Sequence, residues 1–204
     1  MPGTTNVLSP ADLARLSKPT GEAGGLPRAA YFDPAFLATE NERLFARRWV
    51  CVGITEDVAA PGSLRPVKAA GKSLILARDL GGAIRVFHNF CRHRGMRLID
   101  DARTGQRVIL CPYHSWSYGL DGALLKTPHA AGIDRHDRDS LPRTLPGLAP
   151  VRHHVWGPLV FVDLSGEAPT FETYIAPLAE RVCLSVTTFT SIMLVNSFTL
   201  AEVI

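Results

Sequence analysis

The chain has 204 residues, of which 46% are hydrophobic and 20% charged, and its formal net charge is +3. This composition suits one globular domain with short flanking segments and excludes an intrinsically disordered chain. No stretch approaches the roughly 18 consecutive apolar residues of a membrane-spanning helix. No secretory signal is visible at the N-terminus, so we expect a cytoplasmic protein without a membrane anchor. The arginines are scattered along the chain, which argues against nucleic-acid binding.

The N-terminal region is predicted to be helical where it is ordered. Residues 1–27 are expected to be a flexible segment, although Ser9 followed by Pro10 has the pattern of a short helix start. A stronger helix start is Asp33-Pro34, after which apolar residues recur at helical spacing through Trp49. We therefore predict a helical extension over residues 28–50 that packs one apolar face on the domain that follows.

From Val50 onward the pattern changes to short β-branched or alternating runs separated by turn residues such as Asp121-Gly122. These runs occupy residues 50–54, 63–67, 73–77, 84–87, 107–110, 115–118, 123–125, 151–155 and 159–164. They favour a mainly β, antiparallel domain, which we place at residues 51–166. A linker helix is predicted from Thr170 to about Val182. A strand over 185–194 then belongs to residues 167–204, which comprise that linker and the start of another domain.

Two loops of this domain each contain one cysteine and one histidine. Cys91 and His93 stand in the first loop, and Cys111 and His114 stand in the second. Two thiolates and two imidazoles suit either zinc or an iron–sulfur cluster. Zinc fingers usually pair cysteine with cysteine and histidine with histidine, whereas each loop here supplies one of each. Such mixed pairing is what a Rieske [2Fe–2S] centre needs, with Cys91 and Cys111 on one iron and His93 and His114 on the other.

The residues around these loops closely resemble the α (large) subunit of the Rieske-type aromatic-ring-hydroxylating oxygenases. The resemblance rests on residues 89–95 (Asn-Phe-Cys-Arg-His-Arg-Gly), 111–118 (Cys-Pro-Tyr-His-Ser-Trp-Ser-Tyr) and 156–162, and it covers roughly residues 28–182. One departure is Ser115, where the family usually has glycine. The resemblance implies an ISP domain-like Rieske fold with one [2Fe–2S] cluster and electron transfer as the function of this part of an oxygenase.

The resemblance also implies partners and a second iron site. Subunits of this family continue into a catalytic domain, where two histidines and one carboxylate hold a mononuclear Fe(II). No histidine follows His154, so we expect the chain to be truncated before that site, with Fe(II) supplied only by a missing domain. A ferredoxin or flavin reductase is the implied electron donor, and a catalytic domain or oxygenase subunits of the family trimer accept the electrons. Aromatic compounds and quaternary amines are both compatible substrates.

Two alternatives to a truncated oxygenase subunit stay open: a stand-alone Rieske ferredoxin-like electron carrier and a structural Cys2His2 zinc protein. Near the loops, a positive patch either receives an acidic redox partner or is simply solvated; it consists of Arg92, Arg94 and Arg97. Two aromatic residues, Trp116 and Tyr118, are expected to shield the cluster from solvent. The remaining cysteines, Cys51 and Cys183, are predicted to be buried. The histidines outside the two loops are predicted to have no role in a site: His88, His129 and His136. The adjacent His153 and His154 should point to opposite faces of a strand and so cannot bind one ion together.

Overall fold

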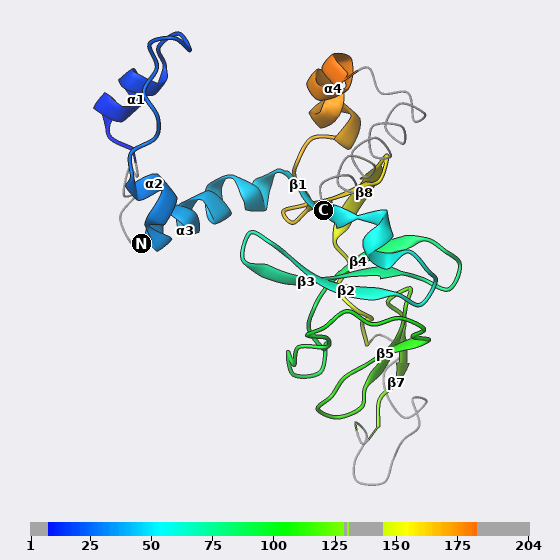
Figure 1. The fold of residues 1–204 in the computed structure, drawn as a ribbon. Coiled ribbons are helices and arrows are strands. Elements are labelled where there is room, and N and C mark those ends of the chain that lie inside the picture. Colours follow the sequence, from blue (N-terminus) through cyan, green and yellow to red (C-terminus); the bar gives the residue numbers. More distant parts are fainter. Residues whose placement is uncertain (1–7, 129, 131–144, 183–204) are drawn as a thin grey trace, which may run out of the picture.

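The computed structural model describes residues 8–128, 130 and 145–182 (Figure 1). Its helices are α1 (Pro10–Leu16), α2 (Ala29–Phe32), α3 (Pro34–Arg43), η1 (Phe45–Arg47), η2 (Thr55–Val58) and α4 (Phe171–Val182). Its strands are β1 (Trp49–Ile54), β2 (Leu64–Ala69), β3 (Lys72–Arg78), β4 (Ile84–His88), β5 (Val108–Leu110), β6 (Ser117–Gly119), β7 (Leu124–Lys126), β8 (Arg152–Trp156) and β9 (Leu159–Asp163). None of these described helices is long and apolar enough to cross a membrane.

The strands form small antiparallel sheets, which confirms the predicted mainly β fold. Among the described residues the sheets are β1-β9-β8, β2-β3-β4 and β5-β6-β7, each of three strands. The β6–β7 connection is the turn predicted at Asp121-Gly122, and Gly122 has φ +89°, a conformation that favours glycine. A side chain at Gly122 would also collide with the Phe87 ring of β4. This close approach brings the small β5-β6-β7 sheet against the β2-β3-β4 sheet.

The core that supports the two cysteine–histidine loops lies between these two sheets. Leu64, Ile75 and Phe87 from the β2-β3-β4 sheet pack in one buried cluster with Ile109 and Tyr118 from the β5-β6-β7 sheet. Cys91 and Cys111 belong to the same cluster. Burying an aliphatic or aromatic side chain contributes about 1.5–3 kcal/mol, so the packing of both sheets stabilises the region from which the loops project.

The N-terminal helices form an arm that extends away from the sheets (Figure 1). A Ser9–Asp12 capping box starts α1, and the Asp33 carboxylate accepts a hydrogen bond from the Ala35 amide at the start of α3, so both predicted helix starts are confirmed. The predicted continuation through Trp49 is wrong, because α3 ends at Arg43 and Trp49 begins β1.

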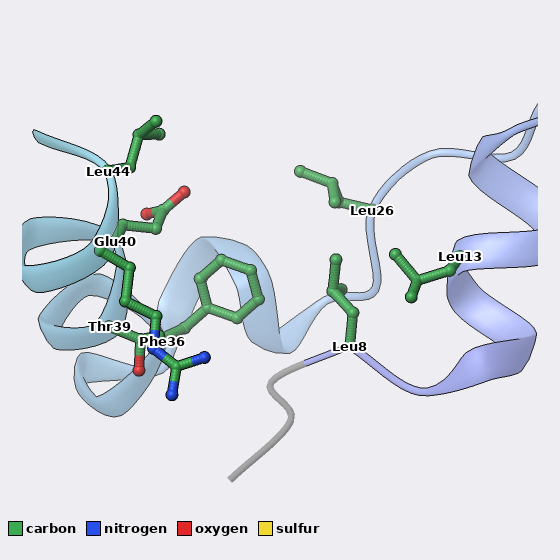
Figure 2. A pocket seen from close by; sticks show the side chains of 8 residues that line it. Leu8, Leu13, Leu26, Phe36, Thr39, Glu40 and Leu44 are labelled. Carbon is green, nitrogen blue, oxygen red and sulfur yellow. The ribbon is translucent and has the colours of Figure 1, made fainter. Parts of the chain in front are cut away.

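The arm also does not pack its apolar face on the β domain as predicted. Phe36 of α3 instead faces leucines from the α1 region across an open groove of about 380 Å³ (Figure 2). Leu37 remains 54% exposed and Leu44 46% exposed. The arm extends away from the sheets, and its apolar side chains therefore face one another across the groove or remain exposed (Figure 1).

The predicted linker helix is present as α4, and an ion pair between a buried carboxylate and a partly exposed arginine holds its start against the β1-β9-β8 sheet. Asp163, at the end of β9, has a side chain with no exposed surface and receives a 2.9 Å hydrogen bond from Arg152 of β8. Arg152 also donates to the Ala168 carbonyl and lies over the ring of Trp49. Phe171 of α4 packs edge-on against Trp49. These contacts fix the direction in which α4 leaves the domain.

Candidate metal centre

The two cysteine–histidine loops have the same backbone hydrogen-bond pattern. In the first loop the Cys91 carbonyl accepts from the amide four residues later, Gly95, and the Cys91 amide donates to the carbonyl five residues later, Met96. In the second loop the Cys111 carbonyl accepts from Ser115, again four residues later, and the Cys111 amide donates to Trp116. The loops are therefore equivalent tight turns, each of which begins at its cysteine.

Because the two turns are equivalent, glycine would suit position 115, where this chain has a serine. Gly95 closes the first turn with φ +71°, and Ser115 occupies the matching position in the second turn with φ +55°. A left-handed conformation is free of steric penalty for glycine and unfavourable by about 1–2 kcal/mol for a residue with a Cβ atom. Ser115 therefore adopts a backbone conformation suited to glycine, immediately after His114.

The turns bring the two thiols together in the core. Cys91 is 1% exposed and Cys111 is 2% exposed. Burial raises the pKa of the Cys91 thiol, and the neighbouring Cys111 thiol raises it further, against the lowering effect of the Tyr118 hydroxyl. The hydroxyl Oη of Tyr118 lies 3.2 Å from Cys91 Sγ. Since Oη already accepts a 3.1 Å hydrogen bond from the Arg92 amide, its own proton is free to be donated to the sulfur.

The two imidazoles lie together at the edge of the same site. The ring centroids of His93 and His114 are 4.9 Å apart, and both side chains are half-buried, in contrast to the fully buried thiols. Trp116 stacks on His93 with a centroid distance of 4.6 Å and an angle of 5° between the rings. Burial lowers the pKa of His93, and the positive charge of Arg94 adds to that effect. The neutral form, which is the form that binds metals, is thereby favoured.

The chemistry of these side chains fits a two-iron cluster. Nδ1 of His114 is buried and has no hydrogen-bond partner within the part of the chain that the structure describes, as expected for a nitrogen whose lone pair binds a metal. Among the described residues, no three His, Cys, Asp or Glu side chains gather around one point as a single ion requires. The four candidate residues instead stand as a thiol pair and an imidazole pair, and in a Rieske cluster each such pair serves one iron.

Asn89 ties the first loop to the β2-β3-β4 sheet, a role that the sequence did not indicate. It is 3% exposed, and its Oδ1 accepts 3.1 Å hydrogen bonds from the amides of both Leu98 and Ile99. Its Nδ2 donates to the Ile99 carbonyl and to the Ser73 hydroxyl of β3. In the sequence, the only sign of this role is that a polar residue stands between an apolar strand and the first cysteine–histidine loop. Its hydrogen-bond partners are known only from the structure.

The arginines beside the loops and the shielding aromatic residues lie as expected from the sequence. Trp116 and Tyr118 are buried in the core that contains the thiols. Arg92, Arg94 and Arg97 are all exposed, and Arg97 pairs with Asp100 at 3.2 Å. The loops are thus apolar underneath and positively charged at the surface.

The remaining predicted candidates do not join the site. His153 faces the Ile84 carbonyl of β4, whereas His154 stacks on Phe171 of α4, which confirms that they point to opposite faces. Burial and the charge of Lys72 lower the pKa of His88. The prediction that Cys51 is buried is wrong: β1 is an edge strand, and the Cys51 side chain is exposed next to an irregularity in its pairing with β9. His129, His136 and Cys183 lie outside the described residues.

Comparison with known proteins identifies the domain that carries these loops. Residues 48–141 match the family described as the Rieske [2Fe-2S] domain. The chain is 37% identical over 153 residues to the glycine betaine monooxygenase oxygenase subunit of Chromohalobacter salexigens, an alignment that covers 75% of this chain and 33% of that protein. It is 30% identical over 161 residues to the carnitine monooxygenase oxygenase subunit of Escherichia coli K12, which covers 79% of this chain and 42% of that protein.

Solved structures give the same result. A crystal structure of a quaternary ammonium Rieske monooxygenase superimposes with a TM-score of 0.65 at 27% identity, covering 78% of this chain and 43% of the other. Naphthalene 1,2-dioxygenase superimposes with a TM-score of 0.63 at 28% identity, covering 73% and 33%. The chain thus spans between about one third and two fifths of the length of these relatives.

Proposed function

We infer that this chain, whose residues 48–141 match the Rieske [2Fe-2S] domain and which aligns with part of several oxygenase subunits, binds one [2Fe–2S] cluster and carries single electrons. The observation that carries the inference is the pairing of two buried thiols and two half-buried imidazoles by equivalent turns. We assign the cluster domain to residues 51–166, after the N-terminal helices and before a linker that begins at residue 167.

The four proposed ligands divide between the two irons by residue type. Cys91 and Cys111 would hold the inner iron, and His93 and His114 would hold the outer iron. When bound, the cluster accepts and releases one electron at a potential above that of an all-cysteine cluster, because neutral imidazoles replace two thiolates. The zinc alternative requires four side chains around one ion, and the division into a buried thiol pair and a half-buried imidazole pair favours two iron positions instead.

The protein environment of each pair has a distinct role. The two thiols are almost fully buried, and Tyr118 would donate to Cys91, whose negative charge would increase on reduction of a bound cluster. The imidazole edge is the part that reaches the surface, so we place electron exchange with partner proteins there. The exposed Arg92 and Arg94 beside this edge suit a partner with an acidic face, such as a ferredoxin or a flavin reductase.

We propose that the electrons serve a mononuclear iron in a catalytic domain, on this subunit or on a neighbouring oxygenase subunit. The relatives are oxygenase subunits, and the reported structure of one quaternary ammonium monooxygenase concerns inter-subunit electron transfer. Several of these relatives oxidise glycine betaine or carnitine, as their names state, which favours a quaternary ammonium substrate over an aromatic one. The aligned part is less than half of the length of those proteins, and we propose that oxidation also depends on the part of them that the alignment leaves out.

Reconstitution of the purified chain with iron and sulfide tests the cluster site. We expect two irons and two sulfides per chain and, after reduction, a rhombic electron paramagnetic resonance (EPR) spectrum of the Rieske type. Cys111→Ser should abolish the spectrum, whereas Cys51→Ser, which changes an exposed cysteine on a different sheet, should leave it unchanged. Stoichiometric zinc in a colourless protein, without that spectrum, would refute the proposal.

Oxygen consumption tests the second half of the proposal. The cluster-loaded chain is mixed with a reductase, NADH and either glycine betaine or carnitine, with and without an oxygenase catalytic subunit. We expect reduction of the cluster in every mixture and substrate-dependent oxygen uptake only when the catalytic subunit is present. Turnover by the chain alone would contradict the inference that the oxidising site lies elsewhere. Efficient reduction with no uptake in any mixture would favour the independent electron carrier.

A further inference from the structure

The indole of Trp116 has an unexplained polar atom. Trp116 is 5% exposed, and its Nε1 is buried without a hydrogen-bond partner among the described residues. A buried donor that lacks an acceptor is unfavourable by about 1–3 kcal/mol, and buried tryptophan N–H groups normally have partners. Trp49 illustrates the usual situation, because its Nε1 donates to the Pro169 carbonyl at 2.9 Å. We therefore expect the indole N–H of Trp116 to have a hydrogen-bond acceptor when the site is complete.

The position of Trp116 restricts what that acceptor can be. Its ring lies flat on the proposed ligand His93, and its backbone carbonyl closes the turn of the second loop by accepting from Cys111. The buried Nδ1 of His114 also lacks a hydrogen-bond partner in residues 8–128, 130 and 145–182, and the His114 ring lies against His93 as well. Two unpaired ring nitrogens thus flank the same imidazole. They are chemically complementary, since Nδ1 offers a lone pair to a metal whereas the indole offers only a proton.

We propose that the indole N–H of Trp116 donates a hydrogen bond to a sulfur atom of the bound cluster. This inference rests on the proposed cluster site and adds to it a residue that tunes the cluster without being a ligand. One group between the loops would then account for both unpaired nitrogens: Nδ1 of His114 would bind iron, and the indole N–H of Trp116 would donate a hydrogen bond to sulfur. Because reduction makes the cluster more negative, this hydrogen bond strengthens on reduction and favours the reduced state. Trp116 is thus a positioning and tuning residue, and its flat contact also orients His93.

Removal of the N–H with retention of an aromatic ring tests the proposal. In reconstituted Trp116→Phe we expect the equilibrium constant for one-electron reduction to fall about fivefold, which corresponds to about 40 mV, as expected when one hydrogen bond is lost. A merely structural role predicts the opposite sign, because water that enters the space left by the smaller ring stabilises the more negative reduced cluster. The matched control is Trp49→Phe, which also removes an indole N–H but in the separate core beneath α4, and should leave the potential unchanged.

An isosteric replacement keeps the test decisive if the smaller ring disturbs folding. Benzothienylalanine at position 116 has sulfur in place of the indole N–H and retains the ring stack on His93. We expect it to lower the potential as Trp116→Phe does and to remove one exchangeable proton from the electron–nuclear double resonance spectrum of the reduced cluster. An unchanged potential together with an unchanged proton spectrum would overturn the inference for Trp116. Failure of the parent chain to form a [2Fe–2S] cluster would instead overturn the proposed function.

Discussion

Replacement of Tyr118 by phenylalanine should lower the reduction potential of the cluster and the stability of the cluster-free chain. The hydroxyl lies 3.2 Å from Cys91 Sγ and accepts from the Arg92 amide at 3.1 Å, and the side chain has no exposed surface. If the hydrogen bond to the thiolate is stronger by about 1 kcal/mol in the reduced state, its loss lowers the potential by about 40 mV. The Arg92 amide also loses its acceptor, which should destabilise the cluster-free chain by about 1–3 kcal/mol.

A redox titration of the reconstituted protein, followed by EPR, measures the first effect, and urea unfolding of the cluster-free chain measures the second. Tyr174→Phe is the matched control, because Tyr174 is 37% exposed on α4 and remote from the loops. A potential that is unchanged or higher in Tyr118→Phe, with the cluster fully retained, would refute the hydrogen bond as the cause of tuning. Burial raises the pKa of Tyr118, so the hydroxyl keeps its proton throughout the pH range of such titrations.

Three further substitutions test the two loops and the Asp163–Arg152 ion pair at the start of α4. Asn89→Ala should destabilise the chain by about 3 kcal/mol in urea unfolding and accelerate cluster loss, since buried amides at the end of the first loop lose their acceptor; cluster retention equal to the parent would contradict this. Ser115→Gly should stabilise the cluster-free chain by about 0.5–1 kcal/mol, because relief of left-handed strain exceeds the added flexibility of the unfolded chain; a loss of stability would count against the strain. Asp163→Ala should destabilise by about 1–3 kcal/mol, because the buried Ala168 amide loses its acceptor and the partly exposed Arg152 loses its carboxylate partner. Burial alone raises the pKa of Asp163, but hydrogen bonds from Ser165 and Arg152 outweigh it and the pKa lies below its ordinary value. The parent should therefore lose this stabilisation as the pH falls below about 4, and unfolding curves of the variant should lack that part of the pH dependence.

The sequence predicts the strands well because turn residues and short apolar runs are local signals. The runs at 73–77, 84–87 and 159–164 overlap β3, β4 and β9. Burial at the margins of the fold is harder to predict, because it depends on which elements cover a residue. Cys51 has the pattern of a core residue but lies on an edge strand, and α3 has apolar residues that no sheet covers.

For the site, spacing and residue type were sufficient to propose the four ligands, which remain a prediction until a cluster is measured. Their surroundings depend on contacts between distant segments, and such contacts leave little trace in a single sequence. Tyr118 reaches Cys91 across 27 positions, and Asn89 reaches Ser73 across 16. The left-handed conformation of Ser115 is understandable only once the second turn is seen to repeat the first.

The two loops that hold the proposed ligands project from different sheets, so a bound cluster would cross-link the sheets as well as carry electrons. The first loop follows β4, and the second joins β5 to β6 in the sheet whose strands have three residues each. Strands this short are marginal without support, whereas a group that binds only the folded state adds its binding free energy to folding. The supply of iron would then affect how much of the protein is fully folded. We expect removal of iron to loosen residues 108–126 before the β1-β9-β8 sheet, so that amide hydrogen exchange there would report how much of the protein is loaded.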